Sequence, residues 1–234
     1  MKQIRGNKRL EIQSTGLIRR GIAIRLIKAQ FQSGDLKLEG LLQVPDNAGA
    51  RPAVVVCHPH PLYGGSMDNN VVNALCDALV NKSIAAFKFN FRGVGGSQGA
   101  FSAGTGEQED VKAAISFLVS HDGVDPARLG LAGYSAGAAW GLAAAYQDKR
   151  IKALAAISPP LSIFDFNFLQ GSRQPRLMIS GSRDEHVQAQ DLLAFCRDLA
   201  EPRECTIIEG ADHSWWGYET AAAETVTNFF SKVL

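Results

Sequence analysis

The sequence of 234 residues contains few cysteines and no long apolar run. Its four cysteines form no C-x-x-C pair and lack metal-ligand spacing, so we expect reduced thiols, as in cytosolic proteins; they are Cys57, Cys76, Cys196 and Cys205. Charged residues interrupt every apolar stretch well before the roughly twenty residues that a membrane-spanning helix needs. The first residues also lack the apolar core of a secretion signal. We therefore expect a cytoplasmic protein without a membrane span.

An excess of charge of one sign is absent as well, because 24 Lys and Arg residues stand against 23 Asp and Glu residues. A net charge near zero produces no field that would attract nucleic acid, so we expect no nucleic-acid partner. The basic residues are nevertheless concentrated in residues 1–28, where only Glu11 is acidic. This segment is either a docking arm or, as we favour, a solvated first hairpin. The composition does not determine the oligomeric state, and a homodimer is possible.

What the sequence does contain is a hydrophobic content of 46%, sufficient for a folded core. Two alternating segments, 22–29 and 36–44, flank turn residues and predict an antiparallel hairpin. From residue 53 onward, short apolar runs typical of strands covered on both faces alternate with helical stretches. The predicted strands are Ala53–Cys57, Ile84–Phe91, Arg128–Gly133, Ile151–Ile157, Arg176–Ser180 and Cys205–Ile208, and the predicted helices are 68–81, 107–120, 136–147, 187–200 and 217–232.

The alternation of strands and helices predicts an α/β fold with a mostly parallel sheet, helices on both faces and the hairpin at one edge. No linker rich in Pro, Gly or Ser divides the chain, and no internal repeat is visible, so we expect a single domain over residues 1–234. A barrel of eight strand–helix units is the weaker alternative, because it usually needs about 250 residues and eight regular units.

A serine lies at a predicted strand-to-helix turn, in the segment Gly133-Tyr134-Ser135-Ala136-Gly137. Such a turn strains the serine backbone and exposes its hydroxyl above the sheet edge. The flanking glycines are needed because a Cβ would collide with the neighbouring strand and helix. The helix N-terminus then brings N–H groups to the reacting oxygen. Ser135 is therefore the predicted nucleophile. The alternative interpretation is that the glycines only allow close packing of the helix, and both can hold.

A serine hydroxyl needs a base, and of the five histidines only His186 and His213 follow Ser135. On this architecture the base lies in the loop after the last strand. That order favours His213 and leaves His186 as a residue of the surface or rim.

The acid that orients the histidine should lie at the end of a neighbouring strand. Asp184 follows the apolar run 177–179 and fits this position, with Glu185 as its substitute. Asp212 is too close in sequence to turn back onto His213. The alternative for Asp184 is a helix N-cap.

Two N–H groups are expected to stabilise the developing oxyanion. One belongs to Ala136, directly after the nucleophile. The other should come from the loop 58–65, with the sequence HPHPLYGG. Because proline has no N–H, His60 is the first candidate, followed by Leu62 and Tyr63.

Metal and phosphate sites find little support in the remaining motifs. The pair His58 and His60 has metal-like spacing, but no matching group completes a ligand set, so we expect no metal and a structural His58. The glycine-rich segment Phe91–Gly99 matches neither the dinucleotide fingerprint nor the P-loop. We expect it to form a compact loop in which Arg92 holds backbone carbonyls. Acids of a first helical turn, not metal ligands, are expected at Glu107, Glu109 and Asp110.

Four motifs in order make the chain similar to the α/β-hydrolase superfamily, in particular its small bacterial "alpha/beta superfamily hydrolase" group. They are residues 58–69, residues 89–95, the serine turn and residues 211–213, and the similarity covers roughly residues 35–234. The resemblance implies a Ser135–Asp184–His213 triad, esterase-like hydrolysis and no cofactor. The basic N-terminal extension and the Ser-Trp-Trp sequence after His213 depart from the pattern, which leaves the substrate preference open.

The expected substrate is a small carboxylic ester. Only residues 158–175 are available for a lid, and their Phe164, Phe166 and Phe168 form either a short apolar rim or core. Thioester or amide cleavage would use the same residues, and a catalytically silent scaffold that binds a partner or small ligand is the alternative from another class. Contacts to the substrate are expected from three aromatic residues, Tyr63, Tyr134 and Trp215.

Overall fold

The computed structural model describes residues 13–19, 22–46 and 49–234. Nine strands are present in this part of the chain: β1 (Gln13–Arg19), β2 (Ile22–Ser33), β3 (Leu36–Pro45), β4 (Arg51–Cys57), β5 (Ala85–Phe89), β6 (Val124–Tyr134), β7 (Ile151–Ile157), β8 (Arg176–Gly181) and β9 (Arg203–Ile208). The helices are α1 (Asn70–Asn81), α2 (Thr105–Val119), α3 (Ala136–Ala145), α4 (Ala189–Asp198) and α5 (Glu219–Val233), with short 3-10 helices η1 (Pro61–Tyr63) and η2 (Asn167–Leu169).

The strands form one sheet in the order β1-β2-β3-β5-β4-β6-β7-β8-β9. The three pairs at one edge, from β1 through β3 to β5, are antiparallel, and the pairs from β5 to β9 are parallel. The predicted α/β fold with an antiparallel hairpin at the sheet edge is confirmed. Because the parallel strands run in one direction, their carboxyl ends meet at one edge of the sheet, where the loops that follow them can form a site.

Strand β1 is an addition to the predicted elements, and it pairs with β2 over its whole length. Its sequence, QSTGLIR, lacks a regular alternation of apolar residues, which is why the pattern did not reveal it. Most of the basic residues among the first 28 lie in residues 1–12 and 20–21, which are outside the described residues. The two interpretations of the basic segment, as a docking arm or as a solvated hairpin, therefore concern residues that the structure does not describe. Within them, Arg25 forms an exposed ion pair with Asp46 at 3.4 Å.

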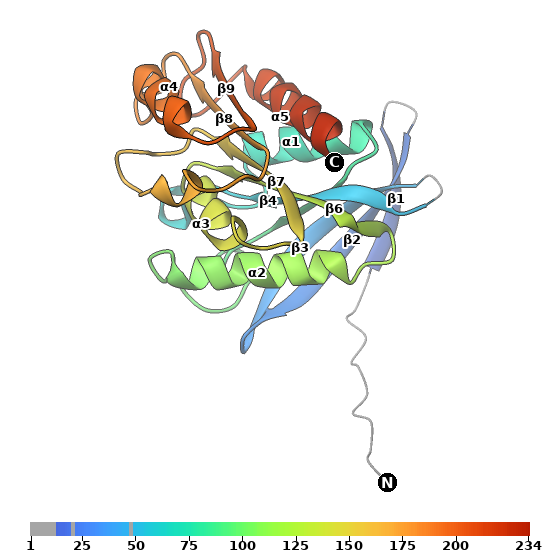
Figure 1. The fold of residues 1–234 in the computed structure, drawn as a ribbon. Helices are drawn as coiled ribbons and strands as arrows, with labels where there is room; N and C mark the ends of the chain where they lie inside the picture. Colours follow the sequence, from blue (N-terminus) through green and yellow to red (C-terminus); the bar gives the residue numbers. More distant parts are fainter. Residues whose placement is uncertain (1–12, 20–21, 47–48) are drawn as a thin grey trace.

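Helices cover the sheet on both faces, as Figure 1 shows. Helices α1 and α5 lie side by side on one face, where Leu75, Leu79 and Phe230 are fully buried. Helices α2, α3 and α4 pack their apolar residues into the core of the other face. Strands between these two layers are shielded on both sides, and every residue of β5 and of β8 is buried. The continuous apolar runs of the sequence follow from this double coverage.

The segment between β7 and β8 is short and contains only the single-turn η2. Phe166 is buried and packs near Phe168 and Phe195, at ring distances of 6.0 and 6.4 Å. Phe164 is partly exposed and lines a surface cavity. Of the two interpretations of these phenylalanines, the position at the edge of the site holds for Phe164 and the position in the core holds for Phe166.

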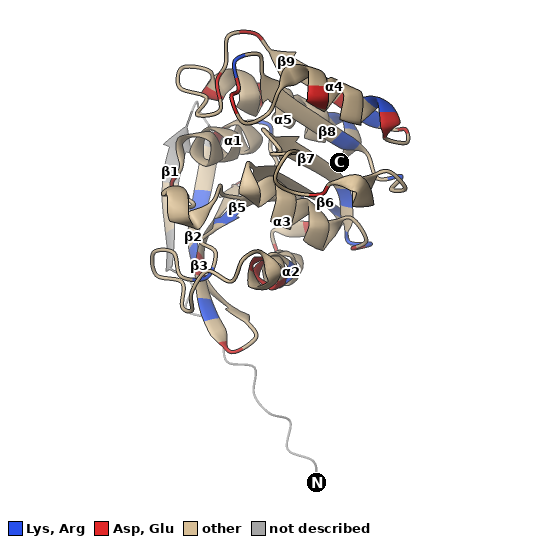
Figure 2. Cartoon of the chain, turned by 90° about the vertical axis from the view of Figure 1, so that its left-hand side faces the viewer, with Lys and Arg blue, Asp and Glu red and all other residues tan. Residues whose placement is uncertain are grey.

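Charged residues of both signs are interspersed over the described chain, as Figure 2 shows. Helix α4, for example, carries Asp191 in its first turn and Arg197 in its last. None of the helices in the described ranges is both long and apolar enough to span a membrane.

Candidate active site

The serine turn has the strained geometry that its sequence predicts. Strand β6 ends at Tyr134 and helix α3 begins at Ala136, so Ser135 alone makes the turn, with φ 54° and ψ −123°. A Cβ on Gly133 would lie 2.3 Å from the carbonyl oxygen of Gly137, and a Cβ on Gly137 would lie 2.3 Å from the carbonyl oxygen of His58. Any side chain at either position would force the turn open. The two glycines therefore keep the turn tight, and the tight turn holds the Ser135 hydroxyl at the sheet edge.

Three side chains from distant parts of the chain meet at this edge. Ser135 Oγ lies 3.0 Å from His213 Nε2, and His213 Nδ1 lies 2.9 Å from Asp184 Oδ1. Because an ionised carboxylate only accepts hydrogen bonds, Nδ1 carries the ring proton. Nε2 is then free to accept from the serine hydroxyl. A base placed in this way can take the proton of a serine as the serine attacks.

Asp184 is fully enclosed and well supplied with hydrogen-bond donors. Its Oδ1 accepts from the backbone N–H groups of His186 and Val187, both at 3.0 Å, and its Oδ2 accepts from Ser180 Oγ at 3.0 Å. Burial works to raise the pKa of Asp184, but the hydrogen bonds, above all that from His213, outweigh it and hold the pKa below its usual value. The carboxylate therefore stays charged beside the imidazole.

The other acids near this point do not take the same role. Glu185 is exposed and lies 3.7 Å from His186, at the surface. Asp212 accepts a hydrogen bond from the backbone N–H of Trp215, inside its own loop. The N-cap interpretation of Asp184 is wrong, because α4 begins at Ala189 and its cap position is Gln188.

The loop that carries His213 is held by side chains from two other elements. Tyr134 donates its hydroxyl to the carbonyl oxygen of His213 at 2.5 Å. Asn70, at the start of α1, donates to the carbonyl oxygen of Ser214 at 3.0 Å and to Glu219 at 3.1 Å. These bonds fix the backbone on which the imidazole stands.

Backbone N–H groups are available beside the serine. In the described part of the chain, the N–H groups of Ala136 and His60 donate to no other protein group. Those of Leu62 and Tyr63 are occupied, because they donate to the Nδ1 atom and the carbonyl oxygen of His60 at 3.2 and 3.1 Å. Of the three loop candidates, His60 alone retains a free N–H.

His58 lies beneath the same loop and is completely buried. Its Nδ1 lies 2.6 Å from the carbonyl oxygen of Pro59, and its Nε2 accepts from the backbone N–H of Phe91 at 3.1 Å. Burial lowers the pKa of His58 to about 4, so the ring is neutral. With both nitrogens engaged by the backbone, His58 has none to offer a metal.

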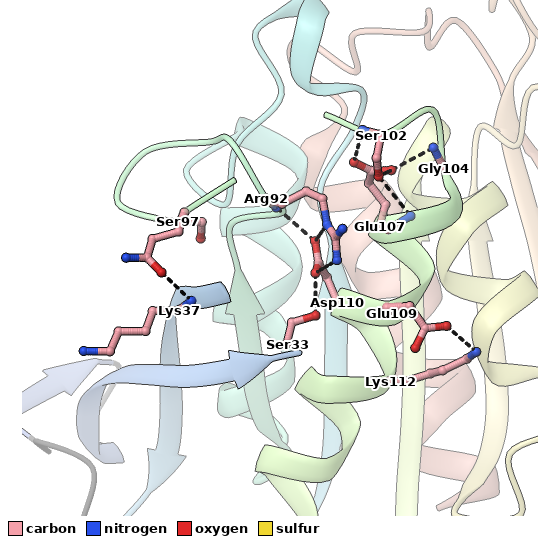
Figure 3. A network of polar contacts seen from close by, with 12 residues as sticks. Ser33, Lys37, Arg92, Ser97, Ser102, Gly104, Glu107, Glu109, Asp110 and Lys112 are labelled. Carbon is pink, nitrogen blue, oxygen red and sulfur yellow. Dashed lines mark hydrogen bonds and ion pairs between the residues drawn. The ribbon is translucent and has the colours of Figure 1, made fainter. Parts of the chain in front are cut away.

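The glycine-rich loop after β5 is anchored by a buried carboxylate, as Figure 3 shows. Asp110 accepts from Arg92 Nη2 at 2.7 Å and from Ser33 Oγ at 2.7 Å. The expectation that Arg92 binds backbone carbonyls is wrong, because fully buried Asp110 requires a cation. Glu107 lies in the first turn of α2 and accepts from the N–H of Gly104 at 2.7 Å. These acids support the loop and the helix.

A cavity of about 620 Å³ opens above the serine. Its lining comes from the loops after β4, β6, β7, β8 and β9 and from the start of α1, and comprises Pro59, His60, Tyr63, Gly64, Gly65, Asn69, Asn70, Tyr134, Ser135, Ala136, Pro160, Ile163, Phe164, His186, His213, Ser214 and Trp216. This volume lies within the range that small-molecule sites occupy.

The predicted substrate contacts have different positions around this cavity. Tyr63 and Tyr134 line it. Trp215 does not, because it is fully buried and its indole N–H donates to Ser158 at 3.0 Å. Trp216, which is 72% exposed, lines the cavity in its place. The prediction for Trp215 is wrong, since the positive φ of that residue turns its side chain into the core.

Several residues of the site were not singled out from the sequence. Asn70 and Ile163 reach it only through the arrangement of loops, and no motif marks them. His186, predicted to lie at the surface or rim, lines the cavity with its ring edge-on to His213, at a ring distance of 4.6 Å.

Comparison with known proteins adds a family to this geometry. The model of the X-Pro dipeptidyl-peptidase (S15 family) matches residues 34–193. An uncharacterized protein of Rickettsia prowazekii is 34% identical over 198 residues, which cover 81% of this chain and 82% of that protein.

Two solved structures are similar over most of their length. A structure described as an alpha-beta serine hydrolase homologue from Coxiella burnetii has a TM-score of 0.79 and 33% identity, and the match covers 86% of this chain and 95% of that one. A structure from Xanthomonas campestris, described as a member of a/b serine hydrolase without lid, has a TM-score of 0.78 and 29% identity, with 87% and 93% covered. The chain therefore belongs to the X-Pro dipeptidyl-peptidase (S15) family within the α/β-hydrolase superfamily, and it is a lidless hydrolase of the α/β serine hydrolase type.

Proposed function

We propose that this hydrolase cleaves small carboxylic esters through an acyl-enzyme on Ser135, without a cofactor. The observation that carries the proposal is the continuous hydrogen-bonded path from Ser135 Oγ through the His213 ring to Asp184, with distances of 3.0 and 2.9 Å. Ser135 and His213 line the cavity, so a carbonyl group can approach the serine hydroxyl.

In the proposed reaction, Ser135 Oγ attacks the ester carbonyl while His213 Nε2 takes the hydroxyl proton. His213 then gives this proton to the alkoxide that leaves, and an acyl group remains bound to Ser135. A water molecule loses a proton to His213 and attacks the acyl group. His213 then returns this proton to Ser135 Oγ as the bond between Oγ and the acyl group breaks, which releases the acid and restores the serine. Asp184 keeps the imidazole in the required tautomer and stabilises its positive charge in both steps.

The developing negative charge on the carbonyl oxygen needs donors that are already in place. The free N–H groups of Ala136 and His60 are suited to this role. Helix α3 begins at Ala136, so the positive end of its dipole adds to the same effect.

The chemistry of the cavity favours an ester over the peptide in the family's name. A dipeptidyl peptidase acts near the free ammonium group of a peptide, and a buried ammonium requires a carboxylate partner. Among the described residues that line the cavity, none is Asp or Glu. The site can accept a neutral ester without that partner, and a thioester differs from it only in the leaving atom.

Hydrolysis of p-nitrophenyl acetate, together with labelling by a fluorophosphonate probe, tests the proposal. We expect hydrolysis and one adduct on Ser135, and we expect Ser135→Ala and His213→Ala each to lower turnover on the order of 10⁶-fold, as members of one catalytic unit do. Ser116→Ala, on the exposed side of α2, is the matched control and should retain full activity. A wild-type protein that neither hydrolyses the ester nor takes the label would instead support the silent scaffold.

A further inference from the structure

Most of the large apolar side chains known to be exposed lie around the cavity. Among the residues whose side-chain burial the structure describes, five are large, apolar and exposed, and three of them, Tyr63, Ile163 and Trp216, line the cavity with exposed fractions of 89, 70 and 72%. Leu62, 69% exposed, precedes Tyr63 in η1. The fifth, Leu193, is 45% exposed on α4 and does not line the cavity. We call Leu62, Tyr63, Ile163 and Trp216 the apolar rim.

The apolar rim is assembled from three separate loops. Leu62 and Tyr63 come from the loop after β4, Ile163 from the loop after β7, and Trp216 from the loop after β9. Exposed apolar groups that gather at one place on a protein surface mark a binding site, whereas scattered ones need no explanation. The convergence of three loops therefore points to a ligand that contacts all of them at once.

Charge gives the second, independent indication of what this ligand is. The described residues that line the cavity include no Lys, Arg, Asp or Glu. The polar groups there are neutral amides and hydroxyls together with histidines, as at Asn69, Ser214 and His186. A charged ligand group would lose its water on entry without gaining an ion-pair partner.

We infer that the apolar rim is a specificity surface, which binds the uncharged, apolar part of a substrate that projects beyond the cavity. The inference rests on the proposed ester hydrolysis and names the substrate class: neutral esters with an apolar chain or ring on the acyl or the alcohol side. The cavity holds the reacting ester group, and the rim contacts the remainder on one face. Since no lid closes over it, the opposite face of the substrate stays in water.

The open geometry sets the size of the effect. A fully buried methylene group is worth about a fourfold gain in binding, so one covered on a single face should gain roughly twofold. The hexanoyl ester has four more methylene groups than the acetyl ester, so KM should fall roughly 16-fold between them and level off for longer chains, which extend past the rim. A preference that kept rising to long chains would require a closed tunnel.

The test compares p-nitrophenyl esters of increasing acyl length and acetate esters of increasing alcohol length, all below their micelle concentrations. Wild-type KM should fall along at least one series. Ile163→Ser combined with Trp216→Ser, in two different loops, should abolish most of that fall, and Trp216→Phe should retain most of it because the ring area is kept. Leu193→Ser removes an exposed leucine outside the rim and should leave the dependence unchanged.

Esters of equal length that end in a carboxylate or a trimethylammonium group test the charge argument. Both should bind more weakly than the neutral ester, and a preference for either charged ester would overturn the inference. A wild-type enzyme that hydrolyses the acetate ester with a KM independent of chain length in both series would also overturn it, while the proposed function would stand. Absence of both hydrolysis and Ser135 labelling would instead refute the proposed function itself.

Discussion

Replacing Asp184 by Asn tests the role of the buried carboxylate with the smallest change of shape. Oδ1 of Asp184 accepts from the backbone N–H groups of His186 and Val187, which cannot move, so the amide oxygen of Asn must take that position. The amide NH₂ then occupies the place of Oδ2, beside His213 Nδ1 at 3.1 Å and Ser180 Oγ at 3.0 Å. The hydroxyl of Ser180 can rotate and accept a hydrogen bond from the amide NH₂.

His213 Nδ1 lies 2.9 Å from the Oδ1 position and 3.1 Å from the Oδ2 position. An N–H on Nδ1 could still reach the amide oxygen, but it would also face an N–H of the amide. The other tautomer, with the proton on Nε2, instead accepts that amide N–H at Nδ1, so we expect the variant to favour it. In that tautomer Nε2, which lies 3.0 Å from Ser135 Oγ, can no longer accept the serine proton. Loss of the correct tautomer typically lowers kcat by about 10⁴-fold, which corresponds to roughly 5 kcal/mol of transition-state stabilisation.

The assay is steady-state hydrolysis of p-nitrophenyl acetate, with the thermal unfolding midpoint measured for each variant. Asp184→Asn should lose about 10⁴-fold in kcat, with KM changed little. Asp212→Asn is the matched control, because an amide oxygen can still accept from the Trp215 N–H, and it should retain wild-type turnover. An Asp184→Asn variant that folds and retains kcat within tenfold of wild type would refute this reasoning.

Three further predictions concern the support of the site. Tyr134→Phe removes the hydroxyl that holds the His213 carbonyl and should lower kcat about fivefold, since one hydrogen bond is worth about 1 kcal/mol; an unchanged kcat would contradict it. Because burial lowers the pKa of His58 from 6.5 to about 4, the unfolded chain binds a proton in this range that the folded protein does not. The free energy of unfolding should therefore fall by up to about 3 kcal/mol between pH 7 and pH 4 from this group. Urea titrations should show a weaker pH dependence for His58→Gln, and an identical slope would refute the assignment. Gly137→Ala places a Cβ 2.3 Å from the His58 carbonyl oxygen, and it should lower the thermal midpoint by several degrees or prevent folding; a variant as stable as wild type would contradict the close approach.

The residues at the centre of the site could be predicted because their chemistry restricts where they can lie. A nucleophilic serine requires the glycines that allow its turn, and the chain order on this fold then directs attention to His213 and Asp184. Because proline has no N–H, two loop positions are excluded as oxyanion donors from the sequence alone. The N–H groups of Leu62 and Tyr63 are excluded only by the structure, where both donate to His60.

The periphery could not be predicted in the same way, because it depends on where loops turn their side chains. Trp215 and Trp216 are equivalent by sequence pattern, yet the backbone at position 215 sends the first into the core and the second to the surface. For a similar reason, Phe164 lines the cavity while Phe166 is buried in the core. The partner of Arg92 depends on Asp110, and only the packing of α2 against the sheet brings the two together.

The most direct measurement of the central claim is the mass of the protein after rapid acid quenching during turnover of p-nitrophenyl acetate. We expect one acetyl group per chain, located by peptide mapping on Ser135, and no acetylation of the Ser135→Ala variant. Turnover of the ester with no acetylated Ser135 at any quench time, or with acetylation that persists in Ser135→Ala, would contradict a mechanism in which His213 activates that serine.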